Sequence, residues 1–244
     1  FRSFRLVHSE RPLQEKMALF WHNHFATAFT KISGVVGSLQ AAKMMALSPG
    51  ALPGPQGQLE LFRQYATDKF QTLLFEVAKD PAMIVWLDGR TNFKARPQEN
   101  FAREVMELFT WGIGHYTEQD VYAAARVFTG WNLRGPIGGN NNTNTAYYEF
   151  FFNPAQHDTS AKTFTFPIYA NGTKTIATRA AADGMRDGMD FIAALAQHPE
   201  TARRLARKLW SFFISELEQP DPQFVEAVAA EYTRNDTNMK PVIR

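Results

Sequence analysis

Apolar residues recur at helical spacing in two long segments of the first third of the chain. In residues 11–29 one stripe is made of Leu13, Met17, Phe20, Trp21, His24 and Ala28. In residues 58–79 the corresponding stripe is Leu59, Phe62, Ala66, Phe70, Leu73 and Val77. Spacings of three, four and seven residues place side chains on one face of an α-helix. The pattern therefore predicts a helix over residues 11–29 and a second over residues 58–79.

Residues 97–111 show the sharpest division between an apolar and a polar face. Pro97 suits the first turn of a helix, and Gly112 suits the position after its end. The apolar side takes Phe101, Val105, Met106, Leu108 and Phe109, and the opposite stripe takes Asn100, Arg103, Glu104 and Glu107. Trp111 extends the polar stripe, which is unusual for a face that meets only solvent. We expect a partly buried polar network there, joined by Arg126 or Arg207 from another helix.

Shorter helical patterns fill most of the remaining chain. Helices are predicted at 81–87, 117–129, 179–197, 199–215 and 222–233, most of them opened by a capping residue or by proline. Residues 132–178 differ, because glycine and asparagine dominate 135–144 and the aromatic run 146–152 is typical of a strand. Residues 162–166 are its candidate partner.

The sequence thus predicts a mainly α fold. We expect an irregular multi-helix bundle with a small β-hairpin insertion around residues 146–166. Residues 1–244 are expected to form a single, mostly helical domain with a loop and β insertion at about 132–178.

Composition excludes several classes of protein. The 244 residues are 45% hydrophobic and include 21 phenylalanines, which indicates a folded globular chain. A net charge of +2 gives no field that would attract nucleic acid. There are no cysteines for disulfides or thiolate sites, and no apolar run approaches the roughly 20 residues of a membrane span. The chain starts at Phe1 and no targeting segment is seen, so we expect a fragment of a longer protein.

Seven short blocks occur in order between residues 20 and 210. They read FWHNHF at 20–25, DPAM-x-x-WLDG at 80–89, ENFARE at 99–104 with ELF at 107–109, G-x-G-x-YT at 112–117, AR with TGW at 125–131, FNP-x-x-HD with KT at 152–163, and ARKLW at 206–210. Each block alone is weak evidence. In series they resemble a large bacterial family catalogued as domain of unknown function 1800.

The resemblance implies a setting but no activity. Members of the family are commonly exported and encoded beside a second uncharacterised, sulfatase-like family. An extracytoplasmic location, periplasmic or secreted, and a protein partner are therefore what the resemblance implies. The chain lacks the usual N-terminal region and C-terminal helices of the family, and Ser160 stands where the family tends to have glycine.

His24 and the polar stripe are two candidate sites. His24 lies within an apolar stripe, where an imidazole needs a partner: a hydrogen-bond acceptor in the core, or the role of ligand or catalytic base. Glu104 and Glu107 could hold a divalent metal on one helix face, as carboxylates do in di-metal bundles. No histidine follows at the expected spacing and Arg103 competes with a cation, which favours a structural ion network.

The loop after the aromatic strand is the stronger candidate for chemistry. His157 and Asp158 could ligate a cation or act as base and orienting group, with Lys162 nearby. The alternative is that the three residues only fasten the loop. The candidate catalytic residues are therefore His157, Asp158, Lys162 and His24, and the candidate metal ligands are His24, Glu104, Glu107, His157 and Asp158. Because the strand is too apolar to stand free in water, we expect this loop to fold back near His24 or near the end of helix 97–111.

The helix predicted at 199–215 is rich in basic residues. Residues 199–215 contain Arg203, Arg204, Arg207 and Lys208, but Arg207 shares a side with Trp210. We therefore expect Arg207 to pack inward against Glu104 or Glu107, and we do not expect nucleic-acid binding.

The leading hypothesis is an exported binding or assembly component that acts with a partner protein or a surface polymer. The alternative is a metal-dependent or acid/base hydrolase-like enzyme that uses the His157 loop and the helix carboxylates. A third is sugar binding by exposed aromatic side chains, with Trp111, Trp131, Tyr147 and Tyr148 as candidates.

Overall fold

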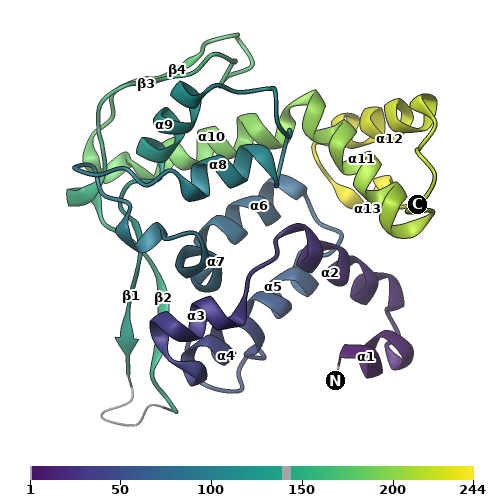
Figure 1. Cartoon of the computed structure of the whole chain (residues 1–244), viewed down its shortest axis with the longest axis horizontal. Coiled ribbons are helices and arrows are strands. Elements are labelled where there is room, and N and C mark those ends of the chain that lie inside the picture. Colours follow the sequence, from purple (N-terminus) through teal and green to yellow (C-terminus); the bar gives the residue numbers. More distant parts are fainter. Residues whose placement is uncertain (1, 139–143) are drawn as a thin grey trace.

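The computed structural model describes residues 2–138 and 144–244 and is mainly helical (Figure 1). The helices are α1 Arg2–His8, α2 Pro12–His24, α3 Phe29–Val36, α4 Ser38–Ala46, α5 Gln58–Gln64, α6 Phe70–Lys79, α7 Pro81–Trp86, α8 Asn100–Glu107, α9 Glu118–Val127, α10 Met185–Gln197, α11 Pro199–Phe213, α12 Pro222–Arg234 and α13 Met239–Val242. The strands are β1 Trp131–Ile137, β2 Tyr147–Phe152, β3 Lys162–Thr163 and β4 Thr175–Ile176. The predicted fold class, mainly α with a small β insertion, is confirmed.

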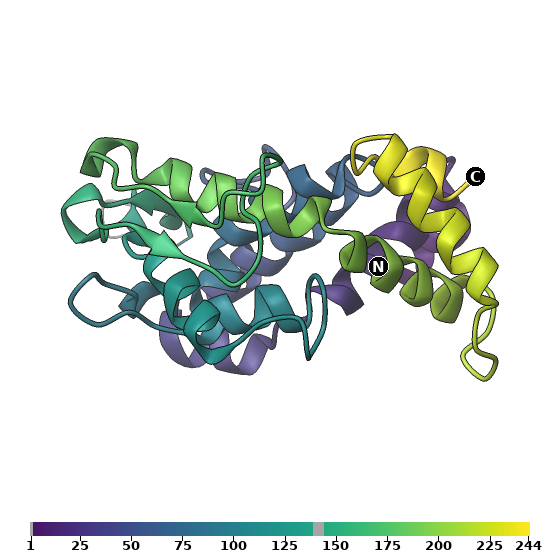
Figure 2. The ribbon, with the colours of Figure 1, turned by 90° about the horizontal axis from the view of Figure 1, so that it is seen from above.

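The strands and the C-terminal helices α11–α13 lie at opposite ends of the molecule in both views (Figure 1, Figure 2). Helix α10 runs between them and packs against α6. The main hydrophobic core takes side chains from α2, from α5 to α13, and from the segment around β3 and β4. This shared core joins the insertion to the helical body, because burial of apolar surface is the main favourable contribution to folding.

The single helix predicted over residues 58–79 is wrong, because the chain leaves the helix between α5 and α6. The carbonyl of Ala66 in this break accepts the indole N–H of Trp21 at 2.8 Å. The backbone of Phe70 donates to Thr237, and Met239 donates to Asp68. Contacts with α2 and with the α12–α13 connection therefore satisfy backbone groups that an unbroken helix would have satisfied internally.

Helices α2 and α8 are shorter than the patterns over 11–29 and 97–111 predict. Helix α2 ends at His24, and α8 ends at Glu107. The ring of Phe25, just after α2, lies in a buried aromatic cluster with Phe62 and Phe109. Tertiary packing of these rings overrides the local helical preference of both ends.

The strand over residues 146–152 exists, but the pairing expected within 146–166 is wrong. β2 pairs with β1 in antiparallel register, with Trp131 opposite Phe152 and Leu133 opposite Phe150. β3 pairs instead with β4. Gly135 and Pro136 in β1 hide its strand character, since both residues are depleted in strands. β1 and β2 thus form a hairpin that starts at Trp131, and residues 139–143 of the glycine- and asparagine-rich segment lie outside the described residues.

Asp80 provides a test of how the core tolerates a buried charge. It caps α7, and its Oδ2 accepts from Met83 N and from Gln58 Nε2, while burial raises the pKa of Asp80 to about 7. The folded protein therefore binds this proton more tightly than the unfolded chain does, so this contribution to stability is largest at acidic pH and is lost as pH rises through about 7.

We predict that Asp80→Asn, which retains a capping side chain, becomes more stable relative to the unmodified protein as pH rises from acid to alkaline. The gain should reach a few kcal/mol, because one unit of pKa shift corresponds to about 1.4 kcal/mol. Urea unfolding at pH about 4.5 and about 8 measures it. Asp221→Asn, at the exposed cap of α12, is the control and should show no such trend. An equal effect of Asp80→Asn at both pH values would contradict the prediction.

Candidate functional site

Three elements meet at His24, the last residue of α2. Its Nε2 lies 3.0 Å from the carbonyl oxygen of Phe109, which can only accept, so Nε2 carries the proton. Its Nδ1 is then the acceptor for the ammonium group of Lys208 on α11, at 3.0 Å. Burial, together with the charges of Lys208 and Arg204, lowers the pKa of His24 well below its usual value. His24 is therefore a neutral, buried imidazole that joins the C-terminal end of α8 to α11.

The early end of α8 supplies the acceptors for this contact. The last carbonyl groups of a helix have no partner within the helix and need one from outside. Lys208 Nζ also lies 3.4 Å from the carbonyl oxygen of Leu108. A cation near the C-terminal end of a helix also interacts favourably with the helix dipole. The position of Lys208 thus follows from where α8 stops.

A cavity of about 500 Å³ lies beside these residues. It is lined by Asn23, His24, Ala26, Lys31, Trp86, Leu87, Asn100, Arg103, Glu104, Leu108, Phe109 and Lys208. Its size falls within the range of about 300–1,000 Å³ that is common for small-molecule sites. Its lining unites four of the sequence blocks that resemble the family, FWHNHF, WLDG, ENFARE with ELF, and ARKLW, which are far apart in the chain.

Two of the three cations in the cavity wall already have anionic partners. Lys31 Nζ lies 3.0 Å from Asp88 Oδ2, which also accepts from the amide of Asn100 at 2.8 Å. Arg103 donates to Glu118 at 2.7 Å and to Glu99 at 3.2 Å. These pairs hold the side chains at the rim in place, and neither cation needs a ligand to balance its charge.

Lys208 and Glu104 differ from the other charged residues of the cavity, because neither has an ion-pair partner within the described residues. Burial and the nearby charge of Arg204 lower the pKa of Lys208 to about 8, and no carboxylate opposes the shift. Burial and Glu107 raise the pKa of Glu104, although Arg103 acts in the opposite direction. Glu104 Oε2 is buried without a hydrogen-bond partner in the described part of the chain. Titratable groups shifted toward neutrality in one cavity are typical of functional sites.

The rest of the polar stripe forms local contacts rather than the predicted network with Arg126 or Arg207. Glu107 accepts from the hydroxyl of Tyr116 at 2.7 Å. Arg207 is exposed, so the expectation that it packs inward is wrong. Arg204, one turn of α11 before Lys208, is the half-buried arginine that interacts with Glu107. The sequence alone suggested Arg207, whereas the structure places Arg204 of α11 beside Glu107.

Arg126 is used elsewhere, in the loop that contains His157. It donates to Asp158 Oδ2 at 2.7 Å and to Ser160 at 2.6 Å. Although burial opposes the shift, the hydrogen bonds that Asp158 accepts from Arg126 and from the backbone and hydroxyl of Ser160 hold its pKa well below its usual range. Asp158 is an ionised anchor for its own loop.

His157 and Lys162 are fully buried against α10. Both contact Asp187 Oδ2, His157 Nε2 at 3.1 Å and Lys162 Nζ at 2.5 Å. The loop does fold back onto the helical body, but its partners are α10 and Thr129 after α9, instead of His24 or the end of α8. Gly184 leaves room for the imidazole, because a Cβ there would stand 2.3 Å from His157 Cδ2. With no exposed polar surface, this cluster has the geometry of a fastening.

The five candidate metal ligands are not brought together. In the segments that the structure describes, no three histidine or acidic side chains are close enough to hold a metal ion. His24 and Glu104 share the cavity, while His157 and Asp158 belong to the buried loop. Two of the four aromatic residues expected to be exposed for sugar binding are buried, since Trp111 and Trp131 are each only 3% exposed and pack in the core.

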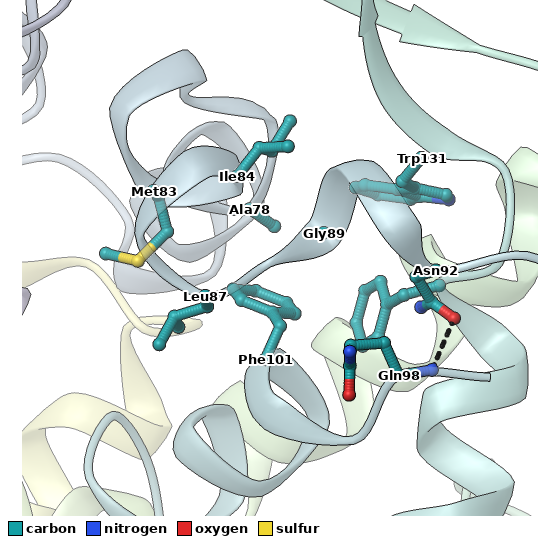
Figure 3. A pocket seen from close by; sticks show the side chains of 10 residues that line it. Ala78, Met83, Ile84, Leu87, Gly89, Asn92, Gln98, Phe101 and Trp131 are labelled. Carbon is teal, nitrogen blue, oxygen red and sulfur yellow. Dashed lines mark hydrogen bonds between the residues drawn. The ribbon is translucent and has the colours of Figure 1, made fainter. Parts of the chain in front are cut away.

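A second, smaller cavity lies under the turn after α7 (Figure 3). It measures about 20 Å³, and Met83, Leu87, Phe101 and Trp131 form most of its apolar wall. Asn92, on its edge, accepts the backbone N–H of Gln98 at 2.9 Å. A space of this size holds about one water molecule, so it is a packing void and not a ligand site.

The family model for "Protein of unknown function (DUF1800)" matches residues 2–244, and the chain belongs to this family. No curated protein and no solved structure matches the chain. Among the described residues, no helix is at once long enough and apolar enough to cross a membrane.

Sequence reasoning identified His24, Asn100, Arg103 and Glu104 as site candidates, but it missed Lys208, Lys31 and Trp86. Lys208 had been noted only as one cation in a basic helix. Its spacing of four residues from Arg204 places both on one side of α11, which was the available signal. Lys31 lies in α3, a helix that the apolar pattern did not predict, and no motif there indicated a site.

We predict that His24→Leu lowers the free energy of unfolding by about 1–3 kcal/mol, because the Phe109 carbonyl and the Lys208 ammonium both lose a partner. Denaturant unfolding measures the change. His115→Leu, at an exposed position, is the matched control and should stay within about 0.5 kcal/mol. A His24 variant as stable as this control would contradict the assigned hydrogen bonds.

We predict that Lys162→Met is severely destabilising, by about 3–5 kcal/mol, because it leaves Asp187 as a buried charge with a weakened set of partners. Lys174→Met, at an exposed position in the same insertion, should be nearly neutral. Thermal unfolding of both variants makes the comparison. Equal midpoints would show that the cluster does not fasten the loop.

Proposed function

We propose that the protein is a binding component whose cavity between α2, α8 and α11 takes an acidic, hydroxylated ligand of the uronate-sugar type. The observation that carries the proposal is that one cavity wall contains two ionisable side chains without partners. Lys208 has no carboxylate partner, and Glu104 has no hydrogen-bond donor, within the described residues.

Each unmatched group favours a different part of such a ligand. The ammonium of Lys208 suits a carboxylate, since hydrogen bonds between charged groups are roughly twice as strong as neutral ones. The carboxyl of Glu104 and the exposed amides of Asn23 and Asn100 suit sugar hydroxyl groups, which both donate and accept. The partly buried Trp86 adds an apolar surface of the kind on which sugar rings pack.

The pairing of the cations, and not the net charge of the cavity, supports an acidic ligand over a neutral one. Lys31 and Arg103 are paired with Asp88, Glu99 and Glu118. Lys208 is left as the uncompensated cation of the wall, and a bound carboxylate would satisfy it at little cost in reorganisation, because His24 already holds the ammonium in place.

An acid/base enzyme is the second candidate function. Its active site would be this cavity and not the His157 loop that the sequence favoured. The same two groups support it, because an amine with a pKa of about 8 and a carboxyl with a raised pKa suit proton transfer near neutral pH. The measurement that would favour the enzyme is the release of reducing ends from acidic polysaccharides, with this activity lost in Glu104→Gln. Binding of the polysaccharide without any turnover would favour the binding component instead.

The setting of the protein is part of the proposal. Family resemblance supports an extracytoplasmic location and a partner from the sulfatase-like neighbour family. Acidic polysaccharides of the cell surface would be accessible there. Co-purification of the two proteins from the source cell's envelope fraction tests the partner.

We predict that the protein binds glucuronate and that Lys208→Met weakens binding by at least about tenfold, which corresponds to about 1.4 kcal/mol. Calorimetry and saturation-transfer NMR measure the affinity. Lys174→Met removes an equal charge away from the cavity and should bind as the unmodified protein does. Equal affinities of the two lysine variants would contradict the role of Lys208.

We also predict that glucuronate affinity falls as pH rises through about 8. Lys208 is charged below its pKa, which burial lowers to about 8, and it becomes a neutral amine above that pH. The ligand carboxylate stays ionised throughout this pH range, so the loss of affinity follows the deprotonation of Lys208. Lys208→Arg, which stays charged, should flatten the profile. A profile that is flat in the unmodified protein would contradict the assignment.

A further inference from the structure

A neighbouring cavity of about 370 Å³ continues from the first. Asn23, His24 and Lys208 line both cavities, so the two spaces meet at these residues. Beyond them, the wall of the neighbouring cavity consists of Phe20, Phe212, Ser211 and Glu216. A ligand that is longer than the first cavity can therefore extend past Lys208 into the neighbouring cavity.

The neighbouring cavity has a different chemical character from the first. Phe20 and Phe212 pack edge to face with ring centroids 5.5 Å apart, and Phe212 is only partly buried. Ser211 and Glu216 are exposed beside them, and Lys208, shared with the first cavity, is the cation that the described residues place in this wall. Glu216 forms no ion pair within the described part of the chain, so its charge is free to repel a second carboxylate.

An aromatic surface with a hydroxyl and a carboxylate beside it favours a neutral sugar. The apolar face of a pyranose can pack on the partly buried Phe212, while its hydroxyl groups donate to Glu216 and exchange hydrogen bonds with Ser211. A uronate placed here would meet Glu216 without a cation of its own, because Lys208 is already the partner of the acidic unit.

Resting on the proposed function, we propose that the ligand is a linear polysaccharide in which acidic and neutral sugars alternate. The acidic unit occupies the cavity of Glu104 and Trp86, and the adjoining neutral unit occupies the cavity of Phe212 and Glu216. The linkage between them lies over Asn23 and Lys208, the residues that the two cavities share. Glu216 excludes chains in which every unit is acidic.

The experiment compares four probes on the intact chain by calorimetry. They are glucuronate, a hyaluronan tetrasaccharide with alternating glucuronate and N-acetylglucosamine, tetragalacturonate, and neutral cellotetraose. The hyaluronan tetrasaccharide should bind at least about tenfold more tightly than glucuronate, because it fills both cavities. Tetragalacturonate should show no such gain, and cellotetraose should bind most weakly.

Variants in the neighbouring cavity separate its role from that of the first. Phe212→Ala should remove the gain of the hyaluronan tetrasaccharide and leave glucuronate affinity unchanged. Phe212→Leu retains apolar packing without the aromatic face and covers the case in which the alanine variant does not fold. Phe151→Ala, on an exposed ring of β2, is the control for loss of a surface phenylalanine. Glu216→Gln should raise the affinity for tetragalacturonate.

The outcomes distinguish this inference from the proposed function. If glucuronate binds and the hyaluronan tetrasaccharide binds no more tightly, the alternating chain is overturned and the acidic-ligand site stands. The same holds if Phe212 variants weaken both probes equally, or if tetragalacturonate binds as tightly as the hyaluronan tetrasaccharide. If no acidic probe binds, both proposals fall.

Discussion

The hydrogen bonds of His24 are the constraint on which the candidate site depends. A neutral imidazole that donates to the Phe109 carbonyl and accepts from Lys208 ties the ends of α2 and α8 to the middle of α11. Without it, the carbonyl groups at the end of α8 would need another partner, because buried backbone acceptors are rarely left unpaired. The cavity lies where these three helices meet, and among the described residues Lys208, which His24 holds, is the cation of its wall without an ion-pair partner.

The site and the fastening of the insertion use similar residues in opposite ways. At Asp187, Lys162, His157 and Arg179 surround a buried carboxylate, although its Oδ1 accepts no hydrogen bond among the described residues. At Lys208 and Glu104, the charged groups share a wall but have no ion-pair partner among the described residues. Charges that are paired in a core help to hold a fold together, whereas charges without an ion-pair partner beside a cavity are candidates for a function.

This contrast explains why the sequence favoured the His157 loop over the cavity at His24. His157, Asp158 and Lys162 lie close together in a loop, and short spacing makes a cluster visible in sequence. Lys208 is 184 residues from His24, its hydrogen-bond partner, and nothing in the local pattern connects them. The resemblance to DUF1800 included both blocks, but membership of a family does not reveal which of its residues meet.

What the sequence by itself determined is the local structure and the buried faces. Capping residues and apolar periodicity identified α7, α9, α11 and α12 closely, placed His24 in the core and separated the insertion from the helices. Only the tertiary structure decided where helices break, which strands pair and which arginine is exposed. Trp21 and Thr237 satisfy the backbone between α5 and α6, and β1 pairs with β2 although Gly135 and Pro136 obscure its pattern. The physical reason is range: periodicity and capping act within a few residues, whereas these choices depend on partners far away in the chain.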